Sequence, residues 1–122
     1  MVNNFKTKED FYLGMKKSLD FVDFLNKTVH PDGKGGFCNA RLLTVTYSYE
    51  DSPEEVHYEE VRHRDGKYVI KTGTVGSGKA YAAETKDDSE QCLEAIANTF
   101  PSCIEYLKSK GATILDITVL GD

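Results

Sequence analysis

The chain has little of what marks several protein classes. Its three cysteines, Cys38, Cys92 and Cys103, are odd in number and include no CxxC pair, which argues against a disulfide framework and a structural zinc site. We expect them to be buried free thiols. No stretch is long and apolar enough to cross a membrane, and the start, "MVNNFKTKED", lacks the apolar run of a secretory signal. These absences predict a cytoplasmic protein that needs no membrane, metal or other cofactor.

Basic residues are also outnumbered. The chain has 15 Lys and Arg against 20 Asp and Glu, for a formal net charge of −5. Nucleic-acid-binding proteins usually present a basic face, because phosphate contacts supply most of their affinity. The balance therefore favours a protein or a small molecule over DNA or RNA as the partner, although an acidic protein can still carry a local basic patch.

The length and composition fit one domain. With 122 residues, 39% of them apolar and 29% charged, the chain can build a single hydrophobic core. We expect one α+β domain over 1–122. It would consist of an N-terminal helix over 7–28, a Gly-rich link over 30–37, and a sheet with a second helix over 40–120.

Helical spacing indicates two helices. In the first, Thr7 can cap the opening turn, and apolar residues recur from Phe11 to Val22. In the second, over 86–111, Asp88 and Gln91 suit a capping box. Its apolar stripe keeps its phase through Pro101, so we predict one helix there rather than two.

The remaining segments alternate polar and apolar residues with a period of two, as strands do. We expect strands over 41–50, 55–64, 67–75, 79–85 and 112–120. "DSPE" and "DG" supply turns between the first three. In the last strand, Leu115, Ile117 and Val119 should face the core. The predicted order is α-β-β-β-β-α-β, an antiparallel β-meander of four to five strands with both helices packed on one face.

One glycine-rich stretch resembles a phosphate-binding loop. "GTVGSGKA", residues 73–80, fits seven of the eight positions of G-x-x-x-x-G-K-[ST]. Ala80 stands where the metal-binding hydroxyl should be, and no helix signal follows directly. We therefore predict a hairpin turn and no nucleotide hydrolysis. A weaker hypothesis stays open, in which a few loop residues bind an anion without hydrolysis. These candidate ligand residues are Gly76, Ser77, Gly78 and Lys79.

The stretch "VHYEEVRHRDGKYVIKTGTVGSGKA" is similar to the Trp-Gly-Arg (WGR) domain family. Tyr58, the turn "DGKY", the glycines at 73, 76 and 78, and the following helix occur in the family's order over residues 56–111. The resemblance implies a small antiparallel sheet with helical flanks. It departs from the signature at Thr72, Thr74 and Lys79, where the family has Trp, Arg and Gln. Because the Trp and Arg carry nucleic-acid contacts in the family, the resemblance supports the fold more than the activity.

Other candidate residues favour contact over catalysis. No Ser/His/Asp or Cys/His motif is visible, and His57 and His63 lie too far apart on one strand to share a metal, which suggests a solvated strand face. Strand tyrosines and the acidic run 50–55 could form a contact surface. The expected partner-contact residues are Tyr47, Tyr49, Tyr58, Glu54 and Glu55.

We therefore expect a small, non-enzymatic cytoplasmic protein that binds another protein, as an inhibitor, an immunity protein or an adaptor does. The alternative is a divergent WGR-like module that binds nucleic acid or a nucleotide ligand. A third hypothesis is an enzyme whose site has no recognisable motif.

Overall fold

The structure is a computed structural model that describes residues 7–29 and 39–120. The predicted Gly-rich link over 30–37 and Cys38 lie outside the described residues. The elements follow the predicted order α-β-β-β-β-α-β, and their bounds are α1 Lys8–Val29, β1 Asn39–Tyr49, β2 Ser52–Arg64, β3 Lys67–Thr74, β4 Ala80–Glu84, α2 Glu90–Ser109 and β5 Ala112–Val119.

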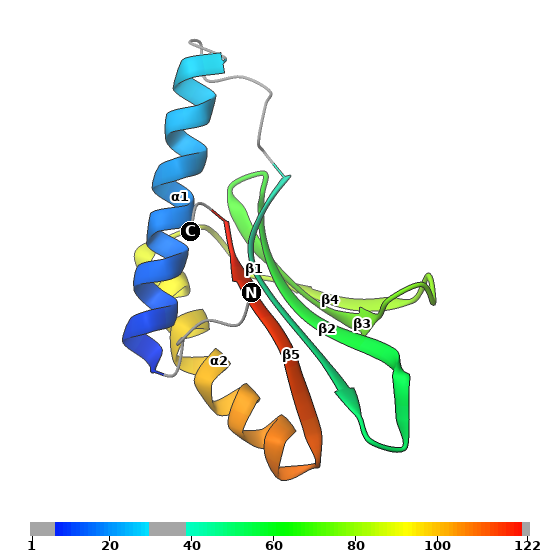
Figure 1. Cartoon of the computed structure of the whole chain (residues 1–122). Coiled ribbons are helices and arrows are strands. Elements are labelled where there is room, and N and C mark those ends of the chain that lie inside the picture. The colour runs from blue at the N-terminus through cyan, green and yellow to red at the C-terminus, as the bar shows by residue number, and fades with distance from the viewer. Residues whose placement is uncertain (1–6, 30–38, 121–122) are drawn as a thin grey trace.

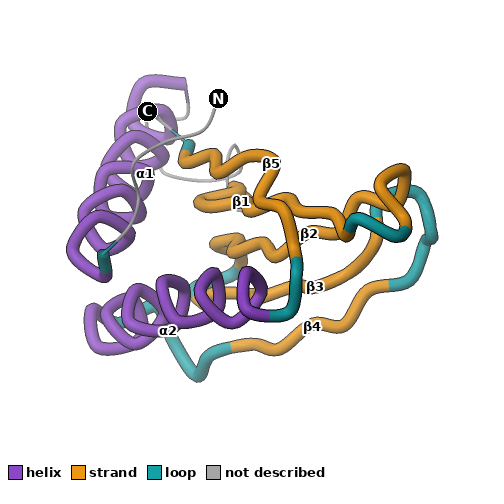
Figure 2. Tube along the Cα trace, turned by 60° about the horizontal axis from the view of Figure 1, so that its bottom comes forward, coloured by secondary structure: helices purple, strands orange, loops and turns teal. Residues whose placement is uncertain are grey.

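The five strands form one antiparallel sheet in the order β4-β3-β2-β1-β5. Four strands follow one another as a meander, and α2 then carries the chain back so that β5 pairs with β1. Both helices lie on the same side of the sheet (Figure 1). Among the described residues, no element covers the opposite side (Figure 2). The α+β fold with both helices on one face is therefore as predicted.

The core lies between the helices and this covered face of the sheet. Phe11 and Met15 of α1 are fully buried, and they belong to one cluster with buried residues of α2 and of the strands. Burying a large apolar side chain contributes about 1.5–3 kcal/mol. The buried residues of this cluster are Phe11, Met15, Leu42, Leu43, Val45, Val61, Tyr68, Leu93, Ile96, Ala97, Phe100, Ile104, Ile117 and Val119.

The helix starts differ in how well the sequence predicted them. Thr7 caps α1 as expected, because its hydroxyl accepts from the backbone N–H of Asp10 at 3.2 Å. In α2 the cap is Ser89, whose hydroxyl accepts from the N–H of Cys92 at 3.3 Å. The expected cap, Asp88, instead bonds to His63. α2 runs through Pro101 as one helix.

A change of register corrects one predicted core residue. Leu115 is 42% exposed, whereas Ile117 and Val119 are buried as predicted. Along β5, Asp116 pairs with Thr46 and Ile114 pairs with Tyr47, so Leu115 is an extra residue at a β-bulge. The bulge reverses the alternation, and Ile114 packs against the core in its place.

Two further expectations need correction. The turn between β1 and β2 comprises only Glu50 and Asp51, because β2 already begins at Ser52. Cys92 and Cys103 were expected in the core, but both are only partly buried. The Cys92 thiol donates to Asp87 at 3.4 Å, and burial raises the pKa of the Cys103 thiol.

Candidate binding face

The side of the sheet without helices, hereafter the open face, is polar and charged. Cross-strand pairing places its side chains in rows, because residues opposite each other point to the same side. One row joins Arg62 to Arg41, the next joins Lys71 to Glu60 and Thr44, and a third joins Tyr58 to Thr46.

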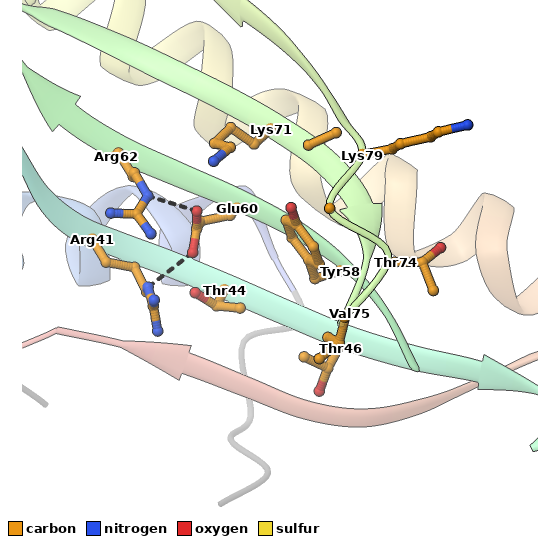
Figure 3. Close-up of a pocket in the computed structure, with 13 residues that line it drawn as sticks. Arg41, Thr44, Thr46, Tyr58, Glu60, Arg62, Lys71, Thr74, Val75 and Lys79 are labelled. Carbon is orange, nitrogen blue, oxygen red and sulfur yellow. Dashed lines mark hydrogen bonds and ion pairs between the residues drawn. The ribbon is translucent and has the colours of Figure 1, made fainter. Parts of the chain in front are cut away.

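The centre of the open face is a nearly buried carboxylate. Glu60 is only 5% exposed, although neither of the two described helices covers it. One oxygen accepts a hydrogen bond from Nε of Arg62 at 2.7 Å, and the other forms an ion pair with Arg41, whose Nε lies 2.8 Å away. A buried carboxylate needs such partners, because desolvation penalises an unpaired charge. The guanidinium groups of both arginines lie beside the Glu60 carboxylate (Figure 3).

These ion pairs leave most of the arginine donors unused. A guanidinium group carries five N–H donors, and both arginines approach Glu60 through Nε. Within the described part of the chain, the Nη atoms of Arg41 and Arg62 have no hydrogen-bond partner. Lys71 lies beside them and points toward Arg62 and Glu60 (Figure 3). Glu60 thus holds two guanidinium groups in place while their outer donors stay available.

The open face is locally basic on an acidic protein. Among the described residues, the pairing register places five basic side chains on it, namely Arg41, Arg62, Arg64, Lys67 and Lys71. Three acidic side chains share the face: Glu60, Glu84 and Asp116. The Glu84 carboxylate forms ion pairs with both neighbours: Oε1 lies 3.5 Å from Nη2 of Arg64, and Oε2 lies 3.8 Å from Nζ of Lys67. The excess of positive charge is therefore concentrated at Arg41, Arg62 and Lys71.

A shallow hollow of about 520 Å³ lies next to this cluster. The two arginines and Lys71 form one side, and the β3–β4 turn forms the other. The hydroxyl of Thr44 is buried there and has no hydrogen-bond partner among the described residues. Such a group is a candidate ligand contact, because buried polar atoms are nearly always paired. The lining residues are Arg41, Thr44, Thr46, Tyr58, Glu60, Arg62, Lys71, Thr74, Val75, Gly76, Gly78, Lys79 and Ala80.

Tyr58 and Gly73 form a matched pair at the floor of the hollow. They are opposite each other on β2 and β3. A Cβ on Gly73 would lie 2.9 Å from the Tyr58 hydroxyl and 2.9 Å from the Lys79 carbonyl. Gly73 is therefore required because the tyrosine ring and the returning chain pass directly over it.

The glycine-rich loop is a hairpin turn, as predicted. Gly76 and Gly78 have φ of +83° and +73°, values that favour glycine. Three backbone N–H groups of the loop already have partners. Val75 donates to the Val56 carbonyl, Ser77 to the Thr74 carbonyl, and Lys79 to the Ser77 hydroxyl. The Lys79 side chain points away from Glu60 and the arginines (Figure 3). Anion binding by Gly76, Ser77, Gly78 and Lys79 stays a prediction, with few free donors to support it.

The predicted contact residues do not form one surface. Tyr58 faces the hollow, and Glu54 and Glu55 are exposed at the start of β2. Tyr47 is 7% exposed on the covered face, so it has little surface to offer a partner. Its hydroxyl donates to Glu59 at 2.9 Å, and burial followed by that bond raises the pKa of Tyr47 far above its usual range. Tyr49 is partly buried and packs edge-on against Tyr47.

The two strand histidines also belong to the covered side and not to a solvated face. His57 stacks on Tyr47 and lies 3.0 Å from the Thr74 hydroxyl. His63 lies 3.0 Å from the Asp88 carboxylate just before α2. The His57 contacts join neighbouring strands of the sheet, whereas the His63 contact joins β2 to the segment before α2. In the described ranges, no group of three or more His, Cys, Asp and Glu residues could hold a metal ion.

Sequence reasoning missed Arg41, Arg62 and Lys71 as a group. The sequence pattern places Arg62 on a strand with a charged face. The face of the sheet on which Arg41 lies, however, depends on a β-bulge in β1. Arg41 pairs with Arg62 and Leu43 with Val61, so Leu42 is an extra residue. Arg41 and Thr44 therefore share a face although they are three residues apart, which simple alternation does not predict.

In the part of the chain that the structure describes, neither helix has the length and apolar content to cross a membrane. No protein-family model, curated protein or solved structure matches this chain. The resemblance to the WGR family accordingly stays a prediction. Any assignment of function must come from the geometry of the open face.

Proposed function

We propose that this chain is a non-enzymatic binding protein whose open face engages an acidic segment of another protein. The observation that carries the proposal is the Arg41–Glu60–Arg62 arrangement. It fixes two guanidinium groups side by side, with their outer N–H donors directed to solvent. Guanidinium donors match carboxylates in charge and in geometry. An inhibitor, an immunity protein or an adaptor would use such a face.

The charge distribution supports a protein partner more than a nucleic acid. The face has only a small excess of positive charge, and the chain as a whole carries −5, which opposes a long phosphate backbone. Thr72 and Thr74, which stand at the positions of the WGR signature Trp and Arg, also offer little for contact with a nucleic acid. The Thr72 hydroxyl donates to Glu59 at 2.6 Å on the covered face, and the Thr74 hydroxyl lies against His57. A WGR-like nucleic-acid module stays the second candidate, supported by the basic cluster alone.

Photocrosslinking followed by charge removal tests the proposal. A photoreactive amino acid at Thr46, on the open face, should capture the partner from the source cells, whereas the same group at Leu13 on α1 should not. Binding of the identified partner is then measured with purified proteins. The double variant Arg41→Ala/Lys71→Ala leaves the Glu60–Arg62 pair intact. We expect it to weaken binding about tenfold or more, with an affinity that falls as salt rises.

The matched control is Lys86→Ala/Lys108→Ala, which removes the same charge from exposed positions outside the open face. Equal binding by the two double variants would refute the proposal. Tight binding of a single-stranded oligonucleotide at physiological salt, lost in Arg41→Ala/Lys71→Ala, would establish the nucleic-acid alternative instead.

A further inference from the structure

Within residues 7–29 and 39–120, the edge strand β4 has backbone groups without a partner strand. β4 is last in the strand order and, among these residues, pairs with β3 alone. In an antiparallel pair, residues that bond to the neighbour alternate with residues whose N–H and C=O point away. The Thr85 N–H bonds to the Tyr68 carbonyl, and pairing continues in step from Glu84 to Ala80. Ala83 and Tyr81 therefore bond to β3, while Ala80, Ala82 and Glu84 direct their backbone groups outward.

The register on the other side of β3 agrees with this assignment. The Val75 N–H bonds to the Val56 carbonyl, which directs the odd-numbered residues of β3 toward β2. The even-numbered residues of β3 are thus the ones that bond to β4. Two separate hydrogen bonds give the same orientation for the β4 edge.

This edge has few of the features that normally block strand addition. Such features include proline, bulges and inward-pointing charges. β4 has no proline, its pairing with β3 has no register shift, and its one charged residue is Glu84 at the end. All five residues are exposed, Tyr81 to 80%. The β3–β4 turn also lies far from the helices in both views (Figures 1 and 2).

The side chains of β4 select what an added strand would carry. On the open face, Ala80 and Ala82 are small, so a long side chain on an added strand can reach past Ala82 to Lys71, its cross-strand partner. On the other side, Tyr81 offers an exposed ring. The opposite edge of the sheet is less suited to an acidic strand, because β5 carries Asp116 on the open face.

We propose that the β4 edge accepts an extended segment of the partner protein as a sixth strand. The segment alternates acidic side chains, which lie on the open face toward Lys71, with apolar side chains, which pack beside Tyr81. Main-chain hydrogen bonds to Ala80, Ala82 and Glu84 supply affinity, and the alternate side chains supply selectivity. This inference rests on the proposed function and specifies the conformation of the acidic segment.

A short capped peptide in which glutamate and valine alternate is the probe. We expect it to slow amide hydrogen exchange at Ala82 and Glu84, and the analogue with lysine in place of glutamate to have no such effect. Ala82→Pro removes the central outward donor without touching the ladder to β3. This variant should bind the peptide about tenfold more weakly, whereas Ala82→Ser, which keeps the N–H, should bind as the parent does. Circular dichroism and the melting temperature of Ala82→Pro check that the fold persists.

Three results with the free chain or the peptides would overturn the inference. The first is unchanged exchange at Ala82 and Glu84 with the glutamate peptide, and the second is equal binding of the lysine analogue. The third is a dimer of the free chain that Ala82→Pro converts to a monomer, since the edge would then serve a second copy. Loss of partner binding in Arg41→Ala/Lys71→Ala but not in Ala82→Pro would refute strand addition alone. Loss in neither variant would refute the proposed function as well.

Discussion

Glu59 and Glu60 are neighbours on β2, yet they lie on opposite faces of the sheet and have different kinds of partner. On the covered face, one oxygen of Glu59 accepts from the hydroxyls of Tyr47 and Thr72. On the open face, Glu60 is held by two guanidinium groups. The neutral donors around Glu59 direct their bonds inward. Most of the charged donors around Glu60 have no partner among the described residues, which is why we propose the open face, and not the covered face, as the binding surface.

The largest difference between the faces should be in apolar packing. Leu43 is fully buried on the covered face, and Leu43→Ala should lower the free energy of unfolding by about 2–5 kcal/mol through lost burial and a cavity. Thr46→Ala, on the open face of the same strand, should change it by less than about 0.5 kcal/mol. Urea denaturation measures both. Similar losses would mean that the open face is packed as the covered face is.

The next largest difference should be in the stability lost when Glu60 or Glu59 is replaced. Glu60→Gln places an amide N–H₂ against a guanidinium group that now lacks its counter-charge, and should cost about 1–3 kcal/mol. Glu59→Gln keeps an acceptor for both hydroxyls and should cost less than about 1 kcal/mol. Chemical denaturation of both variants at neutral pH decides the order. The reverse order would show that the covered carboxylate, not the open one, depends on its charge.

The β3–β4 turn at the end of the open face should respond to backbone strain alone. Gly78 has a φ of +73° with open space around its Cα, so Gly78→Val should lower stability by about 1–3 kcal/mol. Lys79→Ala should change it by no more than about 0.5 kcal/mol. Thermal denaturation with a panel of nucleotides adds a ligand test. Stabilisation of the parent by a nucleotide, lost in Lys79→Ala, would contradict the plain hairpin.

A stabilising change is expected beside Glu60. Thr44→Val is nearly isosteric and removes the buried hydroxyl that has no partner in the described part of the chain, so it should raise the free energy of unfolding by about 1 kcal/mol. If that hydroxyl contacts the partner, the same variant should also bind it more weakly. Denaturation and binding measured on one preparation separate the two effects. A loss of stability would show that the hydroxyl already has a partner in solution.

The smallest effect at neutral pH is the contribution of Tyr68 ionisation, on the covered face, to the free energy of unfolding. It can be measured only in alkaline solution. Burial, followed by the nearby Asp88 charge, raises the pKa of Tyr68 to about 12. An unfolded tyrosine titrates near pH ~10, so the folded state keeps its proton longer. This stabilisation is complete below about pH 10 and is lost as the pH rises toward 12. Urea denaturation across this range should show the loss, and Tyr68→Phe should reduce it. An equal loss in Tyr68→Phe would assign it to other groups.

Much of the fold was predictable because it depends on local signals. Hydrophobic period, the "DG" turn and the capping threonine gave the order and type of the elements. The errors arose at positions whose burial depends on pairing with a segment that is distant in the sequence. Leu115 was placed in the core because strict alternation holds only until a bulge, and the bulge is defined by pairing with β1. Tyr47 was expected at the surface, but its face is covered by a helix from the other end of the sequence.

The candidate site was less predictable for the same reason. Tyr58 and the glycine-rich loop were identified from the sequence and do line the hollow. The arginine pair was not, because its two members come from different strands and are brought together by Glu60. A sequence shows charges along a chain, whereas this site depends on charges across three strands.

The pairing of β5 with β1 has a consequence for how the chain folds. β1 to β4 pair with their neighbours in sequence, so these hairpins need only short loops to close. β5 pairs with β1, although three strands and a helix separate them in the chain, and such closures are slow because they cost more entropy. Until β5 docks, β1 is an unprotected edge of apolar residues, the kind of strand that pairs with other chains. During synthesis on the ribosome, one edge of β1 therefore remains unpaired until β5 has emerged. In that interval we expect aggregation to be most favoured and chaperone binding to matter most.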